Sequence, residues 1–480
     1  MRMWLDPWIR WVFPARDPED LAALRIGVSM VMLLVVSART AAHFAVYPAE
    51  LCFPPGYFAR GIGRIEVQAW WVWAVYAVFV PSAAMALVGW RSRTSALVML
   101  VTGTVLLSVP QFFGKIVHYN HLVWFAMLLP ISPCGDAWSV DAWRGRRAAR
   151  LRGEVIATIP PHVAYGVPLR CVVVLLGVIY FFPGLRKVTE IGPEWASAES
   201  IINFLHIKWR EYDSGMDRWW WQAADAGYAA AWVRVDCVPW LCAAIGWFTI
   251  VFELGFLPLA LWRRTRLIVL LAGLGFHAGI YATMGITIGH VVVGYLALVR
   301  WRRVTMPMRS RVSYGEVHKV AASVAARAYR PWPAIVVGAM LIAGNIHNGV
   351  FRRNDWPLGE YPTFAFRSGP RMAHLEVIAM LPDGRERVLS ERMLGRYTES
   401  SRARGLAGIL MADVPPSRDR LMAMWEVWKR LDPTLGEAER VRFERVEIEV
   451  HPEAAPDPIE RRVLYEARCE TAIVGVNDAK

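Results

Sequence analysis

The sequence predicts a mainly α-helical, polytopic membrane bundle of about eight to nine transmembrane helices, followed by a small C-terminal α+β exoplasmic domain. Three observations predict this fold class: the composition, a series of long apolar stretches, and alternating polar and apolar residues in the last part of the chain. Of the 480 residues, 55% are hydrophobic and 20% are charged, whereas soluble domains have about 45–50% apolar and about 25% charged residues. This composition excludes intrinsic disorder, collagen and a coiled coil.

The N-terminal segment, residues 1–20, has no continuous apolar core and no small-residue cleavage site of a signal peptide. It carries Trp4, Trp8 and Trp11 beside arginines and prolines. Tryptophan favours the headgroup region of a bilayer, so we expect an interfacial segment before the first span.

Nine stretches approach the ~20 residues that a helix needs to cross a bilayer. They are Leu21–His43, Ala69–Trp90, Thr94–Phe113, His118–Ile131, Tyr165–Phe182, Val235–Leu261, Leu267–Tyr281, Ile286–Val299 and Pro333–Ile346. The fourth, seventh and eighth are short, so the series allows for half-helices or for a count that differs by one.

The basic residues predict how these spans are oriented. Lys and Arg number 54 against 41 Asp and Glu, which gives a net charge of +13. Arginine clusters follow spans two, four, six and eight, and they share one side of the membrane if the spans alternate. Because cytoplasmic loops are enriched in Lys and Arg, we expect a cytoplasmic N-terminus and an exoplasmic C-terminal region. The charge excess therefore requires no nucleic acid partner.

The tail after the last span predicts a separate folded unit. Alternation predicts strands at His374–Met380, Arg387–Ser390, Val446–Val450 and Arg462–Tyr465, and a helix is expected at Met422–Leu431. Pro382, Asp383 and Gly384 supply a turn that joins the first two strands into a hairpin. We expect a transmembrane unit over residues 1–350 and a small α+β domain over residues 351–480.

The first candidate site is the Arg186-Lys187 pair at the outer end of span five, where Pro183 and Gly184 are expected to break the helix. A lysine kept out of water loses its proton more readily and can act as a base. The structural alternative is a pair of cations that reach from a helix end to the interface.

The second candidate is Tyr119-Asn120-His121 at the start of span four. A histidine beside an amide can bind a small polar ligand or move a proton, and the alternative is a hydrogen-bonded cap at the interface. His277 and His290 are a third candidate, for a metal or proton site. Since no third ligand has a usable spacing, we expect buried, hydrogen-bonded histidines and no metal.

Arg25 in span one and Glu253 in span six are intramembrane charges. Such charges most often pair with each other or with backbone carbonyls, so we expect a structural role for both.

Several motifs occur in the order found in the HTTM domain family, which includes the vitamin K-dependent γ-glutamyl carboxylases. They are Asp17-Pro18 leading to Arg25, Asn120-His121-Leu122, Asp136 to Asp141, Tyr180 to Trp195 with its Gly-Leu-Arg-Lys core, Phe276-His277, Asp355-Trp356-Pro357 and Asp383-Gly384-Arg385. The chain resembles this family over nearly its whole length, and the family topology is similar to the one that the charges predict.

The resemblance implies a site chemistry. In the family, a lysine, here Lys187, deprotonates reduced vitamin K, which reacts with oxygen to give a strong base. That base removes a hydrogen from a substrate glutamate, and the carbanion captures carbon dioxide. The resemblance places Asn120 and His121 in the reacting pocket as further catalytic residues. It makes Arg186, His277 and Tyr119 candidates for binding the quinone.

The chain also departs from the family pattern. The family has two lysines where this chain has Arg186-Lys187, and the animal enzymes have a much larger exoplasmic region. The resemblance implies a disulfide between Cys52 and the exoplasmic domain, where Cys469 is the candidate partner.

We therefore expect a quinol-dependent enzyme of the γ-carboxylase type, a carbon–carbon lyase or ligase with quinol epoxidase activity. Its cofactor would be reduced vitamin K or menaquinol, without a metal, and its second substrate a peptide or a small acidic molecule. The resemblance implies a bacterial homologue in the inner (plasma) membrane, in contact with the lipid bilayer. The rival class is a non-catalytic membrane protein that binds a lipid or presents its C-terminal domain to a partner. A transporter is a weaker third class, because no paired broken helices in two related halves are visible.

Overall fold

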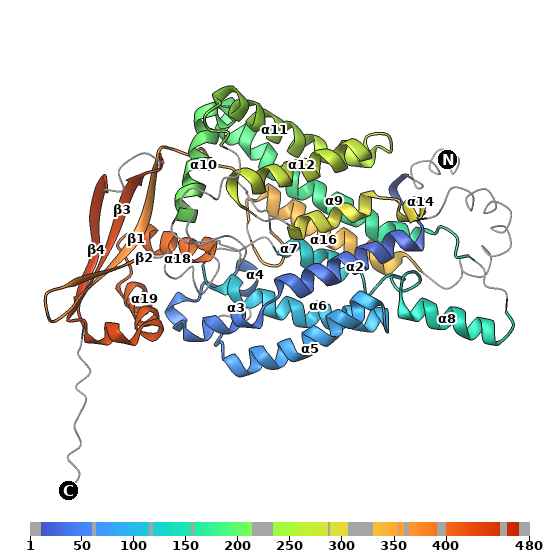
Figure 1. Cartoon of the computed structure of the whole chain (residues 1–480), viewed down its shortest axis with the longest axis horizontal. Helices are drawn as coiled ribbons and strands as arrows, with labels where there is room; N and C mark the ends of the chain where they lie inside the picture. Colours follow the sequence, from blue (N-terminus) through green and yellow to red (C-terminus); the bar gives the residue numbers. More distant parts are fainter. Residues whose placement is uncertain are drawn as a thin grey trace, which may run out of the picture.

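A computed structural model describes residues 11–59, 64–114, 119–154, 158–213, 234–286, 289–305, 330–353, 355–359, 364–390, 400–451 and 458–469. The predicted interfacial residues Trp4 and Trp8 lie outside the described residues. The described part is an elongated helical bundle with a β-sheet at one end (Figure 1). The mainly α-helical fold class with a small C-terminal α+β part is confirmed.

In the part of the chain that the structure describes, seven helical segments are long and apolar enough to cross a membrane. Their main helices are α2 (Pro18–Val35), α5 (Ala69–Val88), α6 (Ser92–Ser108), α9 (Val163–Arg186), α11 (Pro239–Leu261), α12 (Arg266–Met284) and α16 (Trp332–Val350). Large apolar side chains remain exposed along them, among them Leu34, Trp70 and Val251. An apolar surface of this extent needs lipid around it, so the protein is a multi-pass membrane protein.

The fourth and eighth predicted spans are shorter than a membrane crossing. The fourth contains α7 (Asn120–Met127), and the eighth contains α13 (Gly289–Val292) and the 3₁₀ helix η6 (Val293–Leu298). After α7 the chain continues in turns that include Pro130 and Pro133. Proline lacks the N–H that a continuing helix needs, which explains why this apolar run does not stay helical. The half-helices that the sequence allowed for are these two segments.

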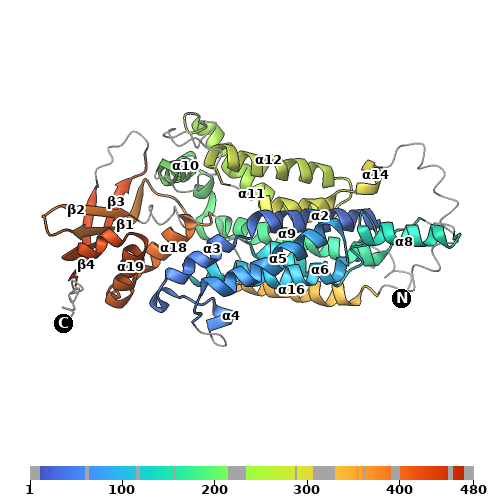
Figure 2. The same cartoon turned by 60° about the horizontal axis from the view of Figure 1, so that its bottom comes forward.

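Short helices connect the long ones. They are α3 (Ala38–His43), η1 (Phe44–Val46), η2 (Ala49–Leu51), α4 (Gly56–Ala59), η3 (Val109–Phe112), α8 (Val140–Leu151), η4 (Lys187–Ile191), η5 (Gly192–Ala196), α10 (Ala198–Asp213) and α14 (Trp301–Thr305). The arginine-rich α8 and α14 lie at the end of the bundle opposite the sheet (Figures 1 and 2). We call these two ends the basic end and the sheet end.

The sheet has four antiparallel strands in the order β2-β1-β3-β4. The strands are β1 (Arg371–Met380), β2 (Glu386–Ser390), β3 (Arg440–Glu449) and β4 (Glu460–Arg468). All four predicted strands are therefore confirmed. Each is longer than expected, and β3 ends at Glu449, one residue before the predicted end. The β1–β2 hairpin is also confirmed: Gly384 adopts a φ of 80°, and its N–H donates to the carbonyl of Leu381 at 3.0 Å.

Helices α18 (Ser400–Ala412) and α19 (Arg418–Leu431), with η8 (Pro433–Glu437), follow β2 in the chain. Figure 1 shows α18 and α19 on the side of the sheet that faces the bundle. Leu375, Val377 and Phe443 are buried in one continuous core with Leu406 and Trp425 of these helices. The predicted helix at Met422–Leu431 is confirmed as the larger part of α19, whereas α18 was not expected.

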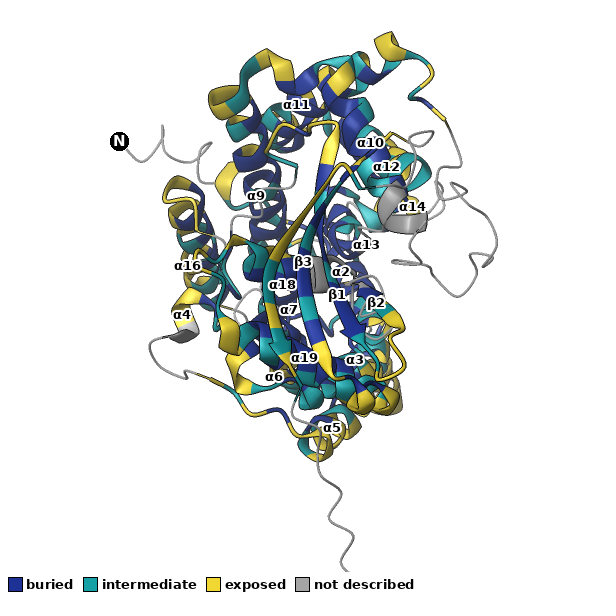
Figure 3. Cartoon of the chain, turned by 90° about the vertical axis from the view of Figure 1, so that its left-hand side faces the viewer, coloured by how far each residue is buried: buried dark blue, intermediate teal, exposed yellow. Residues whose placement is uncertain are grey.

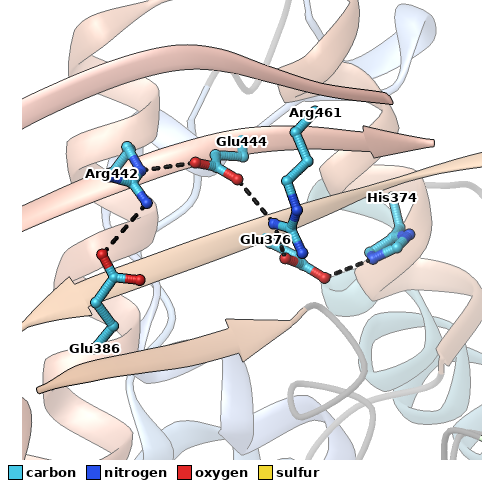
Figure 4. Close-up of polar contacts among 6 residues, drawn as sticks. All are labelled: His374, Glu376, Glu386, Arg442, Glu444 and Arg461. Carbon is cyan, nitrogen blue, oxygen red and sulfur yellow. Dashed lines mark hydrogen bonds and ion pairs between the residues drawn. The ribbon is translucent and has the colours of Figure 1, made fainter. Parts of the chain in front are cut away.

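The outer face of the sheet, which Figure 3 shows from the front, carries a network of ion pairs (Figure 4). Arg461 donates to both Glu376 and Glu444, at 2.7 and 2.9 Å. These two glutamates are directly opposite each other on β1 and β3, so the arginine offsets a repulsion between like charges. The whole network consists of His374, Glu376, Glu386, Arg442, Glu444 and Arg461.

Several contacts join the C-terminal part of the chain to the bundle. Arg430 of α19 donates to the carbonyl of Val46 at 2.6 Å, and Asp355, just after α16, accepts from the N–H of Gly56 at 2.6 Å. Cys52 and Cys469 are both free thiols. The disulfide implied by the resemblance is therefore not formed. The proposed division of the chain at residue 350 stays a prediction, although α16 ends at Val350.

Candidate functional site

A cavity of about 320 Å³ lies toward the sheet end of the bundle. Side chains from α7, α9, α10, α11 and α12 form its walls, and residues 359 and 364 close it from the segment after α16. Most of the lining is aromatic or aliphatic. Its polar members are Asn120, His121, Tyr180, Lys187, Thr249, Glu253, His277 and Thr283.

Lys187 and Glu253 form an ion pair in this cavity. The Lys187 Nζ donates to both carboxylate oxygens of Glu253, at 2.6 and 2.7 Å. The same Nζ lies 4.7 Å from the ring centroid of Trp195. Lys187 is 1% exposed and Glu253 is 5% exposed. The Lys187 ammonium is thus shielded from water, as was expected, but it lies beside the negative charge of Glu253.

Helix α9 brings Lys187 to this position. Pro183 and Gly184 were expected to break the helix, and this expectation is wrong, because α9 continues to Arg186. At Lys187 the winding changes to the π-helix η4. Burial of most of α9 between its neighbours outweighs the local preference of these two residues, and single π-helical turns often occur at functional sites. Gly184 also makes room for the pair, because a Cβ there would lie 2.8 Å from the Cβ of Glu253.

Helix α7 contributes Asn120 and His121, both more than nine-tenths buried. The Asn120 Nδ2 donates to the carbonyl of Asp355 at 3.2 Å, and the His121 ring stacks on that of His290 with centroids 4.8 Å apart. The Asn120 Oδ1 and the His121 Nε2 have no hydrogen-bond partner among the residues that the structure describes. Buried polar atoms of this kind are commonly hydrogen-bonded to a ligand or to an ordered water.

His277 and Tyr180 form a second polar group in the wall. The Tyr180 hydroxyl is 2.6 Å from the His277 Nε2 and 2.7 Å from the hydroxyl of Tyr295. Within the described ranges, no three His, Cys, Asp or Glu side chains lie close enough together to hold a metal ion. The expectation of buried, hydrogen-bonded histidines thus fits His277.

Four of the six predicted site residues, Lys187, Asn120, His121 and His277, line the cavity. Arg186 and Tyr119 do not belong to this lining. Arg186 points toward Glu190, with 3.9 Å between the Arg186 Nε and the Glu190 Oε1. The ring centroids of Tyr119 and His290 are 5.1 Å apart.

The role of Glu253 was missed in the sequence. Arg25 and Glu253 were expected to pair with each other or with backbone carbonyls, and the second outcome is confirmed for Arg25. It donates to the carbonyls of Cys134 and Trp138, at 2.9 and 2.6 Å. Helix α9 lies between α2 and α11 (Figure 1), so it separates the two charges. Arg186 and Lys187 were the cations predicted at the outer end of a neighbouring span, and that was the available signal for the true pair.

No curated protein and no solved structure matches the chain. A family model described as the HTTM domain matches residues 13–293, which is more than half of the 480 residues and includes α7, α9, α11 and α12. The chain therefore belongs to the HTTM domain family.

Proposed function

We propose that this protein is an integral membrane enzyme that binds a reduced lipophilic quinone in the cavity and promotes its oxygenation, in the manner of the vitamin K-dependent γ-carboxylases. The observation that carries the proposal is the convergence of Lys187, Asn120 and His121 on one apolar cavity. A protein that used the bundle only as a scaffold would gain nothing from burying these groups together, because each buried polar group costs stability.

The residues present fit such a ligand. The cavity volume of about 320 Å³ lies at the lower end of the range of about 300–1,000 Å³ for small-molecule sites, so it suits a ring system whose hydrocarbon tail extends outside. Aromatic walls match the faces of fused rings. The unpartnered Asn120 Oδ1 and His121 Nε2 supply hydrogen bonds for ring oxygens. A bound quinol would supply the electrons for the reaction with oxygen.

A lipophilic ligand would enter from the bilayer between α11 and α12. Phe248 lines the cavity and is about half exposed on the outer surface of the bundle. On α12, Gly275 and Gly279 also line the cavity, and a Cβ at either position would meet nothing within 4 Å. The wall on this side is therefore thin.

The charges support an orientation for the chain. The arginine-rich α8 and α14 share the basic end of the bundle (Figure 1), and basic residues favour the cytoplasmic side. We infer an inner (plasma) membrane location in a bacterium, with a cytoplasmic N-terminus and an exoplasmic sheet. The cavity then opens toward the outer half of the bilayer. A peptide or small acidic substrate for a coupled carboxylation would approach from the sheet end.

The test is quinol epoxidation by the purified full-length chain, given reduced vitamin K or menaquinol and oxygen. We expect Lys187→Ala to lower epoxide formation by about 100-fold or more, the range for loss of a positioned acid or base. Lys429→Ala is the matched control, because Lys429 pairs with Glu426 on the distant α19. Equal epoxide formation by the wild type and Lys187→Ala would show that Lys187 takes no part in the reaction. Quinol binding without any epoxide would favour the non-catalytic, lipid-binding class.

A further inference from the structure

Two contacts of Lys187 favour its protonated form. Its Nζ donates to both oxygens of Glu253 and lies over the Trp195 ring. A carboxylate and an aromatic face both attract a cation. The lone pair that a lysine needs to act as a base is therefore not available while the pair is intact.

Glu253 is the only carboxylate among the described residues that line the cavity. Each of its oxygens accepts one hydrogen bond from Lys187, and a carboxylate oxygen has room for a second donor. The other basic groups of the wall are histidines. His277 is already bonded to Tyr180. A proton on His121 would place a new positive charge beside His290, and the one carboxylate of the described lining, Glu253, is already paired with Lys187.

We propose that Glu253 is the group that accepts the proton of the ligand hydroxyl, and that Lys187 keeps its own proton and stabilises the oxyanion that forms. This proposal rests on the proposed function and exchanges the roles of Lys187 and Glu253 within it, so that Glu253 is the base. The O–H bond of the ligand breaks, its electron pair stays on the ligand oxygen, and the proton forms an O–H bond with Glu253.

Charge conservation favours this arrangement. Before the transfer the site holds one ammonium and one carboxylate, and afterwards it holds one ammonium and one ligand oxyanion. The negative charge only moves from one neighbour of Lys187 to another. In an apolar cavity this costs far less than separating new charges, because an unpaired buried ion is strongly destabilising. The fixed ammonium then acts as a preorganised stabiliser of the developing anion.

The test uses a naphthol with a short alkyl chain, which has one ionisable hydroxyl and an absorption spectrum that changes on ionisation. The probe is bound to the full-length protein, without oxygen or turnover. We expect the wild type to hold a larger ionised fraction than free solution at the same pH. We expect Glu253→Gln to bind the probe but to lower the ratio of ionised to neutral probe by about tenfold or more, equivalent to about 1.4 kcal/mol. Lys187→Arg keeps the positive charge and is expected to ionise the probe more than Glu253→Gln does.

A second measurement needs no substitution. The infrared difference spectrum of the wild type with and without the probe is expected to show loss of a carboxylate band and gain of a protonated carboxyl band, both shifted by isotopic labelling of glutamate. Glu426→Gln, in the exposed Glu426–Lys429 pair, is the matched control and should behave as the wild type.

The outcomes separate the two proposals. If the wild type ionises the probe while Glu253→Gln ionises it equally and no carboxyl band appears, Glu253 is not the acceptor and the quinol function stands. If the wild type neither binds the probe nor forms epoxide, the quinol function itself is wrong.

Discussion

Lys187 and Glu253 show how much a single residue's role depends on its neighbours. Burial of a lysine was predicted from its position at a span end, and that burial is observed. The counter-charge was not predictable, because Glu253 lies 66 residues further along the chain and reaches Lys187 only through the packing of α11 on α9. Asn120, His121 and His277 were found from the sequence because an ionisable or amide group within an apolar run is conspicuous on its own.

Gly184 is the residue that sets the distance between the two helices at the pair. A methyl group there would lie 2.8 Å from the Cβ of Glu253, so Gly184→Ala must push α11 away. We expect a loss of about 1–3 kcal/mol in the free energy of unfolding, typical of overpacking, together with reduced epoxide formation. Thermal unfolding of the purified chain measures the first effect.

Gly408→Ala is the control for this substitution. Gly408 lies within α18, and a Cβ there would meet nothing within 4 Å. Alanine favours a helix over glycine by roughly 1 kcal/mol, so this change should leave stability equal or higher. If both substitutions have the same effect, the close approach of α9 and α11 at Gly184 is not what positions Glu253.

Among the elements, the long helices were the most predictable. Apolar stretches predicted all seven candidate spans of the described residues, because a helix needs about 20 predominantly apolar residues to cross the hydrocarbon core. The short elements were less predictable. The apolar runs around α7 and α13 were predicted to be spans, but prolines after α7 end the helix there. Helix α9, in contrast, continues past Pro183 because it is packed on several sides. Local preference and tertiary packing compete, and the sequence alone does not show which prevails.

The ion network on the sheet predicts a response to acid. Hydrogen bonds from His374 and then Arg461 lower the pKa of Glu376 below its usual value, against the opposing effect of burial. A carboxylate with a lowered pKa stabilises the fold above its unfolded pKa and loses this contribution as the pH falls through the folded pKa. We therefore expect β1 and β3 to lose protection from hydrogen–deuterium exchange below about pH 4, near the ordinary pKa of glutamate.

Arg461→Ala tests the origin of this response in the full-length chain. It leaves Glu376 and Glu444 opposite each other without their shared donor. We expect the free energy of unfolding to fall by about 1 kcal/mol at neutral pH. This is less than is usual for charged hydrogen bonds, because Arg461 is partly solvated. The acid dependence should also become weaker. Arg385→Ala, in an exposed turn pair with Asp383, should change neither the free energy of unfolding nor its acid dependence. An equal effect of the two variants would mean that the network does not stabilise the sheet.

At the scale of the whole molecule, the cavity is closed by parts of the chain that are far apart in sequence. Trp195 donates to the carbonyl of Phe364 at 2.7 Å, and Trp124 donates to that of Pro357 at 2.7 Å. The segment after the last long helix therefore folds back onto the bundle before the sheet begins. The sequence predicted the strands from their alternation, but it could not predict this return, because no periodic pattern marks a contact between distant loops.

The central claim is that this membrane-embedded cavity binds a lipophilic ligand with ring hydroxyls. Photolabelling in native membranes with a diazirine derivative of menaquinol, followed by mass spectrometry, tests it most directly. The account predicts labels on the cavity residues Trp195, Phe248 and Phe276 that excess unlabelled menaquinol removes. Labels confined to lipid-facing residues such as Leu271, which is well exposed on α12, and unchanged by the competitor, would contradict it.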